Sequence, residues 1–251
     1  MKLLLQILWG WSVLANGAVG IQVGTVQINN QNIKLMKTNF TSPVWLQSAS
    51  NVGGGEPVTR FVLTEGVNQV DLTANGSVVV ESVQGGEVVR ETYSALDNTY
   101  VTINADEGTE VVIYGAVTVI NNNETNNLFA SLDVSKNTSL TALYCNNCTG
   151  LTSLDTSKNT ALTELDCNEC QNLLMLNIKN TADLVNGIIL DQSMANLTTL
   201  QVAGTSEWAY EQVESWLADY APDNGMLYVD ENTPQGVIAE AEGKSWTVEY
   251  V

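Results

Sequence analysis

The chain has 251 residues, of which nine are Lys or Arg, 28 are Asp or Glu and none is His, so its formal net charge is −19. This length allows one large domain or two to three small domains with a buried core. The negative charge disfavours nucleic acid and anionic lipid as partners, and the lack of histidine excludes acid–base catalysis and metal ligation by that residue.

The segment before Ala18 combines one lysine with a short apolar run and ends in small residues. This pattern fits a cleaved signal peptide, and it also fits an apolar arm that docks onto a partner or another copy. The run is too short and too interrupted to span a bilayer as a helix. Because the sequence begins at Met1, which a processed secretory chain would have lost, we expect an anchoring and oligomerisation arm over residues 1–54. Its candidate docking residues are Leu3, Leu5, Ile7, Leu8, Trp9 and Trp11.

Weak alternation of apolar and polar side chains predicts two short strands within residues 19–50, and a glycine-rich breaker follows at residues 52–57. Beyond the breaker come seven short β runs, and Asn75-Gly76 and Gly85-Gly86 are typical of hairpin turns. Strands at this spacing, without a helical pattern, predict a small antiparallel β-sandwich over residues 55–115. The seven runs are residues 59–64, 69–72, 77–82, 87–93, 99–103, 110–114 and 117–120.

A 22-residue repeat lies in the middle of the chain. The segment LTALYCNNCTGLTSL begins at Leu140, and its copy LTELDCNECQNLLML begins one period later, at Leu162. The preceding linkers, DVSKNTS from Asp133 and DTSKNTA from Asp155, recur at the same interval. A fixed period with this spacing of leucine and cysteine is typical of leucine-rich repeats. We assign residues 116–204 to such repeats, including a partial earlier copy and a degenerate later one.

Each repeat is expected to form one short strand and a return segment, and stacked repeats then bury a continuous core behind a parallel sheet. Alternation along the strands places one set of side chains on the outer face, where solenoids commonly bind partners. Two carboxylates on one strand without a cleft are typical of a solvated face, so we expect no catalytic residue. The candidate partner-binding residues are Tyr144, Asn146, Glu164, Asp166 and Asn168.

The four cysteines form two C-x-x-C pairs, one in each repeat. The first cysteine of a pair occupies an inward strand position, and the second occupies the position that leucine-rich repeats give to Asn or Cys. Because adjacent strands lie about 4.8 Å apart, stacked pairs fit reduced thiols, disulfides or a zinc site. We favour a reduced, buried structural ladder with no metal and no cofactor. Its members are Cys145, Cys148, Cys167 and Cys170.

The apolar spacing becomes helical after the repeats. Ser206 is placed to cap one helix, and Pro234 lies at the first position of a second helix that ends at Gly243. A strand follows each helix, at residues 226–229 and 246–251. Two helix–strand units with right-handed crossovers would extend the parallel sheet and cover its open edge.

Residues 132–145 and their copy at 154–167 resemble the cysteine-containing leucine-rich repeats of surface proteins in gut anaerobes, which also occur in virion proteins of the tailed phages that infect these bacteria. The segment KSWTVEY, from Lys244, is similar to the terminal cap of such proteins. The resemblance covers about a third of the chain and implies binding or display without a reaction. The chain departs from the family in having few repeats and in carrying a second cysteine at the usual asparagine position.

The expected fold is mainly β with an α/β C-terminal part. It comprises the N-terminal arm, the antiparallel β-sandwich, a short leucine-rich-repeat solenoid and a cap of two helix–strand units over residues 205–251. We expect a non-enzymatic virion surface protein, a head fibre or capsid decoration, docked on a capsid shell protein or another virion protein through its N-terminus. It would be a homo-oligomer with a host-surface protein or glycan on the repeat face, and with neither nucleic acid nor a membrane span. The alternative is an exported bacterial cell-surface adhesin with a cleaved signal peptide.

Overall fold

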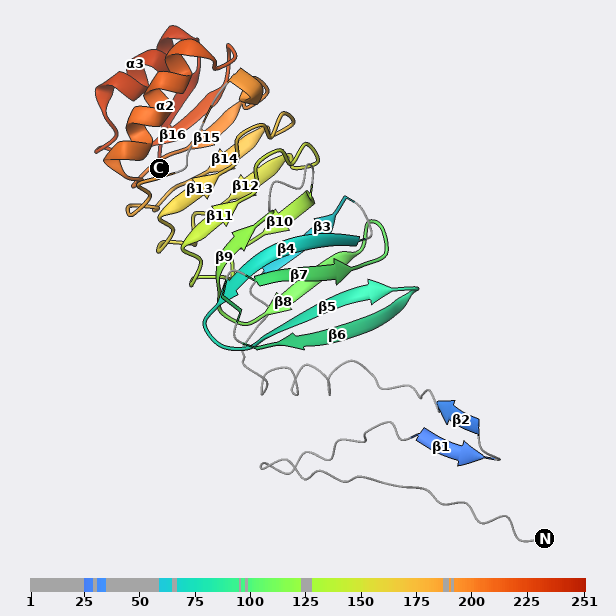
Figure 1. The fold of residues 1–251 in the computed structure, drawn as a ribbon. Coiled ribbons are helices and arrows are strands. Elements are labelled where there is room, and N and C mark those ends of the chain that lie inside the picture. The colour runs from blue at the N-terminus through green and yellow to red at the C-terminus, as the bar shows by residue number, and fades with distance from the viewer. Residues whose placement is uncertain are drawn as a thin grey trace, which may run out of the picture. The chain divides into compact units, whose positions relative to one another are not determined.

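A computed structural model describes residues 25–28, 31–34, 59–64, 67–94, 96–97, 99–122, 128–186, 190 and 192–251. The chain divides into two compact units, Met1–Leu46 and Gln47–Val251. In the first unit, strands β1 (Thr25–Ile28) and β2 (Gln31–Lys34) pair antiparallel, within the region where two short strands are expected. The protein is mainly β, with several sheets and a C-terminal α/β part, as the sequence predicts (Figure 1).

The second unit begins with seven strands that match the seven predicted β runs. Inward side chains from two sheets, among them Phe61 and Ile113 on one and Leu72 and Val101 on the other, meet in one buried core. The strands are β3 (Thr59–Leu63), β4 (Val67–Ala74), β5 (Val78–Gln84), β6 (Glu87–Tyr93), β7 (Thr99–Asn104), β8 (Glu110–Tyr114) and β9 (Val117–Asn121).

The predicted turn at Gly85-Gly86 joins β5 to β6. Both glycines have positive φ, 60° and 77°, which suits the two-residue turn that matches strand twist, and Gln84 pairs directly with Glu87 across it. The Asp106 carboxylate accepts the N–H groups of Gly85 and Gly86 at 2.8 and 2.7 Å. These two bonds lower the pKa of Asp106, so the ionised carboxylate holds the turn.

In one of the two sheets, hydrogen-bonded pairing continues from the strands of the predicted β-sandwich into the repeat region. One sheet has the order β10-β3-β8-β5-β6 and is antiparallel, and a second has the order β13-β11-β9-β4-β7. Strand β9 pairs antiparallel with β4 and parallel with β11, so the second sheet crosses the boundary expected at residues 115/116. The added strands are β10 (Phe129–Asp133), β11 (Ala142–Tyr144) and β13 (Glu164–Asp166).

The periods that begin at Leu140 and Leu162 each contain two strands, not one strand and a return segment as expected. Strands β12 (Ser153–Asp155) and β14 (Met175–Asn177) alternate along the chain with β11 and β13, but they pair with each other in a third sheet. That sheet is parallel and continues through β15 (Thr199–Gln201), which follows a short 3₁₀ turn at Gln192–Met194. Figure 1 shows these short strands stacked between the β-sandwich and the two helices.

The structural unit is therefore half of the 22-residue sequence period, and we call it a half-turn. Each half-turn buries the side chains at its first, fourth, sixth and ninth positions. The strands of successive half-turns belong to different sheets, and the inward side chains of these sheets share one core. For two successive half-turns the buried positions are Phe129, Leu132, Val134 and Asn137, then Leu140, Leu143, Cys145 and Cys148.

Buried asparagines hold the half-turns together, and Asn159 connects two of them. It has no exposed surface, and its Nδ2 donates to the carbonyl oxygens of Val134 at 2.9 Å and Asn137 at 2.6 Å. Replacing Asn159 with Ala is expected to lower the free energy of unfolding by about 1–3 kcal/mol, because buried carbonyls lose a donor. Urea denaturation measures this loss.

Asn172 is the matched control for that substitution. Its Nδ2 donates to the Thr149 carbonyl at 2.8 Å, but the side chain is exposed, so water can replace it. Asn172→Ala is expected to change the unfolding free energy by no more than about 0.5 kcal/mol. Equal losses for the two variants would contradict a role for burial.

Two helix–strand units end the chain and extend the third sheet. Helix α2 (Glu207–Asp219) is capped by Ser206, whose Oγ accepts the N–H of Ala209 at 3.0 Å, as predicted. Strands β16 (Met226–Val229) and β17 (Thr247–Tyr250) continue the sheet, β16 parallel to β15 and β17 parallel to β16. Helix α3 (Gln235–Gly243) differs in detail from the prediction. Pro234 is its N-cap and not its first helical residue, and Ser245, at φ 61°, takes the left-handed conformation expected of a glycine.

Candidate functional site

The residues expected to bind a partner lie together at the outer side of β11 and β13. Leu143 and Leu165 point inward with no exposed surface, whereas Tyr144, Glu164 and Asp166 are half-buried on the opposite side. Asn146 and Asn168 follow the two strands and are also half-buried. The pairing of β11 with β13 sets Tyr144 directly opposite Asp166. Their partner-binding role stays a prediction.

Tyr144 and Glu164 are joined by a hydrogen bond across the two strands, with the Tyr144 hydroxyl donating to Glu164 Oε2. Burial, this hydrogen bond and the negative charge of Glu164 together raise the pKa of Tyr144 to about 12. The tyrosine is therefore neutral at physiological pH and serves as a hydrogen-bond donor with an aromatic face, not as a base.

Asp166 and Asn168 have a structural role that the sequence pattern does not predict. The Asp166 Oδ1 accepts the Asn168 N–H at 3.1 Å, which is the side-chain-to-backbone bond of an Asx turn. Asp133 and Asp155 make the same bond at 2.9 Å to the residue two positions later. One oxygen of Asp166 is thus used to form the turn that ends its strand.

The same face continues through β9 and extends beyond the repeats onto β4 and β7, where no site is predicted from sequence. The register sets Tyr144 opposite Asn121, Asn121 opposite Asp71, and Asp71 opposite Tyr100. We call Asp166, Tyr144, Asn121, Asp71 and Tyr100 the outward row. Directly opposed side chains on neighbouring strands are within contact distance of each other, so the row is one continuous strip across the second sheet.

Asp71 is the most buried member of the outward row. It is 3% exposed, and its Oδ1 accepts no hydrogen bond. Burial raises the pKa of Asp71, although the backbone N–H of Leu72 opposes this effect. Val70 and Leu72, which flank it on β4, have no exposed surface and belong to the core. Alternation therefore directs Asp71 to the outer face, and that signal was available in the sequence.

A pH titration tests the coupling between Tyr144 and Glu164. Glu164→Gln is expected to move the pKa of Tyr144 from about 12 back toward the ordinary value of 10.0, because the negative charge is removed. In the wild-type protein the folded-state pKa lies above the unfolded one. The stabilisation is therefore complete below pH 10 and is lost as the pH rises through about 12.

The absorbance change of tyrosine ionisation measures this shift, and the Tyr144→Phe variant identifies which transition belongs to Tyr144. An identical high-pH transition in the wild type and Glu164→Gln would show that the hydrogen bond does not set the pKa.

The four cysteines lie in the interior as thiols, not as disulfides, and have no exposed surface. The Cys170 thiol donates to the Cys145 carbonyl oxygen at 3.2 Å, just as Asn159 donates to the Val134 carbonyl. Cysteine at the ninth position of a half-turn thus makes the bond that asparagine makes elsewhere. The contact with Cys170, followed by burial, raises the pKa of the Cys145 thiol, and burial raises that of Cys148 to about 11. Buried thiols with a raised pKa, such as those of Cys145 and Cys148, act as packing groups, whereas the hydrogen bond with Cys145 lowers the pKa of Cys170.

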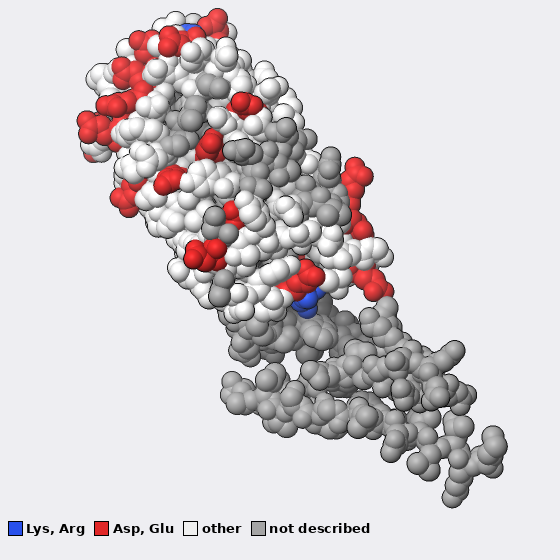
Figure 2. Space-filling view, in the orientation of Figure 1, with Lys and Arg blue, Asp and Glu red and all other residues white. Residues whose placement is uncertain are grey.

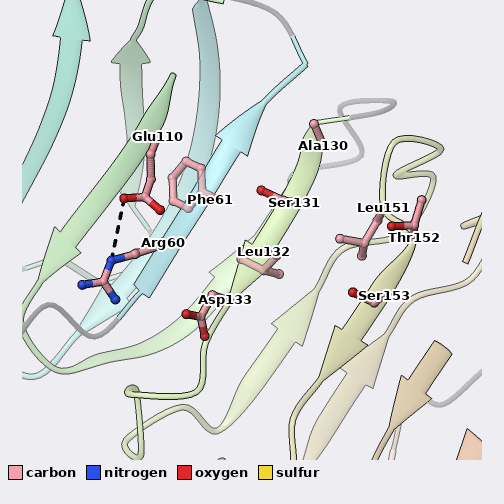
Figure 3. A pocket seen from close by; sticks show the side chains of 10 residues that line it. All are labelled: Arg60, Phe61, Glu110, Ala130, Ser131, Leu132, Asp133, Leu151, Thr152 and Ser153. Carbon is pink, nitrogen blue, oxygen red and sulfur yellow. Dashed lines mark ion pairs between the residues drawn. The ribbon is translucent and has the colours of Figure 1, made fainter. Parts of the chain in front are cut away.

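A small cavity of about 140 Å³ lies at the seam where β10 and β12 are edge strands of different sheets (Figure 3). Arg60 and Glu110 form an ion pair at 3.8 Å on one side of it. Burial opposes ionisation of Asp133, but hydrogen bonds from Ser135 and the charges of Arg60 and Lys136 lower its pKa overall. The cavity is smaller than ligand pockets, which hold about 300–1,000 Å³. Its lining is Arg60, Phe61, Glu110, Ala130, Ser131, Leu132, Asp133, Leu151, Thr152 and Ser153.

The remaining predictions concern the N-terminus, metals and membranes. Leu3, Leu5, Ile7, Leu8, Trp9 and Trp11 lie outside the described residues. Within the described part of the chain, no group of three or more Cys, Asp or Glu side chains is arranged to hold a metal ion. Neither α2 nor α3 is long and apolar enough to cross a membrane, and no other helix in the described ranges is either.

Comparison with known proteins gives no relative from which a function could be transferred. No protein-family model, no curated protein sequence and no solved structure matches the chain.

Proposed function

We propose that this protein is a non-enzymatic binding protein that displays the outward row on a short leucine-rich-repeat solenoid. The main support is the division of side chains between the two sides of the second sheet. Inward positions carry core leucines and buried thiols, whereas the outer side carries Tyr144, Glu164 and Asp166. A parallel ladder that presents polar and aromatic side chains on one side is suited to recognition of a partner.

The leucine-rich-repeat assignment rests on the sequence period and on the parallel stacking of equivalent residues, Leu143 on Leu165 and Leu154 on Leu176. Because each turn contains a second strand, a parallel sheet forms on both sides of the solenoid. The C-terminal units extend the third sheet by β16 and β17, so that β15 is not its edge strand.

We place the protein on a virion surface as a head fibre or capsid decoration. Residues 1–54 would dock on a capsid shell protein or another virion protein and bring copies together, leaving the outward row available for a host-surface protein or glycan. The support is the resemblance of the repeats to virion proteins of tailed phages, together with a net charge of −19 that disfavours nucleic acid as partner. Figure 2 agrees with this charge balance, because acidic side chains far outnumber basic ones on the face shown and gather over α2 and α3.

The alternative is an exported bacterial cell-surface adhesin with a cleaved signal peptide, favoured by the apolar segment that follows Lys2. Mass spectrometry of purified virus particles and of the bacterial envelope separates the two. Finding the full-length chain in particles, and its loss from them when residues 1–54 are deleted, is the expected result. A chain found only in the envelope and beginning near Ala18 would replace the virion proposal with the adhesin.

A further inference from the structure

A ligand on the outward row would satisfy the carboxylate oxygen of Asp71 that lacks a hydrogen-bond donor. A carboxylate oxygen held out of water without a hydrogen-bond donor is costly, yet Asp71 is 3% exposed and its Oδ1 accepts nothing. Tyr100, directly opposite, is 55% exposed. A ligand that lies against Tyr100 would therefore bring its polar groups beside Asp71.

The neighbouring amide restricts the chemistry of that ligand. Asn121 stands directly opposite Asp71 on β9. A side-chain amide has two donors and two acceptor sites, whereas a carboxylate only accepts. A vicinal pair of hydroxyls both donates and accepts, and so it complements the two side chains together. A lysine or arginine side chain only donates and would match Asp71 alone.

Two tyrosines give the row its length. Tyr144 and Tyr100 lie on β11 and β7, which are separated by β9 and β4, so three strand spacings of about 4.8 Å put them about 14 Å apart. That distance exceeds one pyranose ring and suits a short chain of them. Tyrosine offers an apolar ring for contact with sugar C–H groups and a hydroxyl for their oxygens.

We propose that the outward row binds an oligosaccharide laid across the strands, with adjacent hydroxyls on Asp71 and Asn121 and sugar rings against Tyr100 and Tyr144. This inference rests on the proposed binding role of the same face and names its ligand class. It extends the site from the repeats onto β4 and β7, where the sequence predicts none.

The test uses the full-length protein on an array of neutral, acidic and amino-containing oligosaccharides, followed by calorimetry with the tightest-binding one. Asp71→Asn and Tyr100→Ala are each expected to weaken binding at least about tenfold, since each removes a contact to the ligand. Asp71→Asn should leave the thermal midpoint unchanged or raised, because it removes a buried charge. This separates loss of binding from loss of folding.

Matched controls are Tyr250→Ala, which removes a comparably exposed tyrosine (64%) from the third sheet, and Asp219→Asn at the exposed end of α2. Both should bind the oligosaccharide like wild type. The inference would be overturned by an array on which nothing binds, by equal binding of Asp71→Asn and wild type, or by binding of an arginine hexapeptide only. Each of these results leaves the particle experiment unaffected, so failure of the glycan inference is distinguishable from failure of the virion proposal.

Discussion

Leu165→Ala is expected to lower the free energy of unfolding by about 2–5 kcal/mol, the usual cost of removing a large buried side chain and leaving a cavity. Leu165 has no exposed surface and stacks in register on Leu143. On its other side the ladder continues through a bridge between Glu164 and Asn186. Each rung of such an array packs mainly on its neighbours, so the cavity weakens the contacts on both sides.

Leu174→Ala is the matched control, because Leu174 lies in the same repeat and is 49% exposed. It should change the unfolding free energy by no more than about 0.5 kcal/mol. Urea denaturation of both variants, with equal m-values, makes the comparison valid. If Leu165→Ala and Leu174→Ala proved equally stable, the inward and outward assignments of this ladder would be wrong.

The strands of the β-sandwich can be predicted from sequence because each is a short apolar run bounded by turn residues. Gly76, Gly85 and Gly86 all have positive φ in the structure. Gly85-Gly86 forms the predicted hairpin, whereas the hairpin predicted at Asn75-Gly76 is wrong, because this turn joins β4 to β5 in a different sheet. Local signals of this kind do not specify which strands become neighbours. The pairing of β4 with β9 joins Asp71 to Asn121, and only the tertiary fold decides that register.

The second strand of each turn was not predicted because the cysteines recur only every 22 residues and so emphasise the full period over its half. Half-turns that begin at Leu140 and Leu162 carry cysteine at their sixth and ninth positions, whereas the half-turn that begins at Leu151 carries Thr156 and Asn159 there. Leucines at the first and fourth positions nevertheless recur in every one of these half-turns. Small polar residues can fill inward positions here because their side chains bond to backbone atoms of the neighbouring turns.

The part of the candidate site that lies on the repeats could be predicted from sequence, whereas the part on β4 and β7 could not. Alternation along the repeat strands identifies Tyr144, Glu164 and Asp166 as outward residues, since each neighbours an inward leucine. The contribution of Asp71 and Tyr100 depends on long-range pairing that sets β4 and β7 beside the repeats. The outward row, which runs from the repeats onto β4 and β7, is therefore recognised only in the folded molecule.

The largest single loss of stability is expected for Trp216→Ala, about 3–5 kcal/mol. Trp216 is 1% exposed on α2 and meets Trp246 edge to face, with ring centroids 5.9 Å apart and an interplanar angle of 86°. The Trp246 Nε1–H donates to the Pro222 carbonyl at 2.6 Å, and a Cβ on Gly225 would collide with the Trp246 ring. This tight packing joins α2 to the segment that leads into β17.

Trp208→Ala on the same helix is the control, and a smaller loss is expected because Trp208 is only partly buried against the core. Hydrogen exchange should show where the stability is lost. Amides of α2, α3 and β17 are expected to lose protection first in Trp216→Ala, and amides of β11 and β13 later, because stability in a stacked array is transmitted from rung to rung. Uniform loss of protection along the chain would instead indicate that cap and repeats unfold as a single cooperative unit.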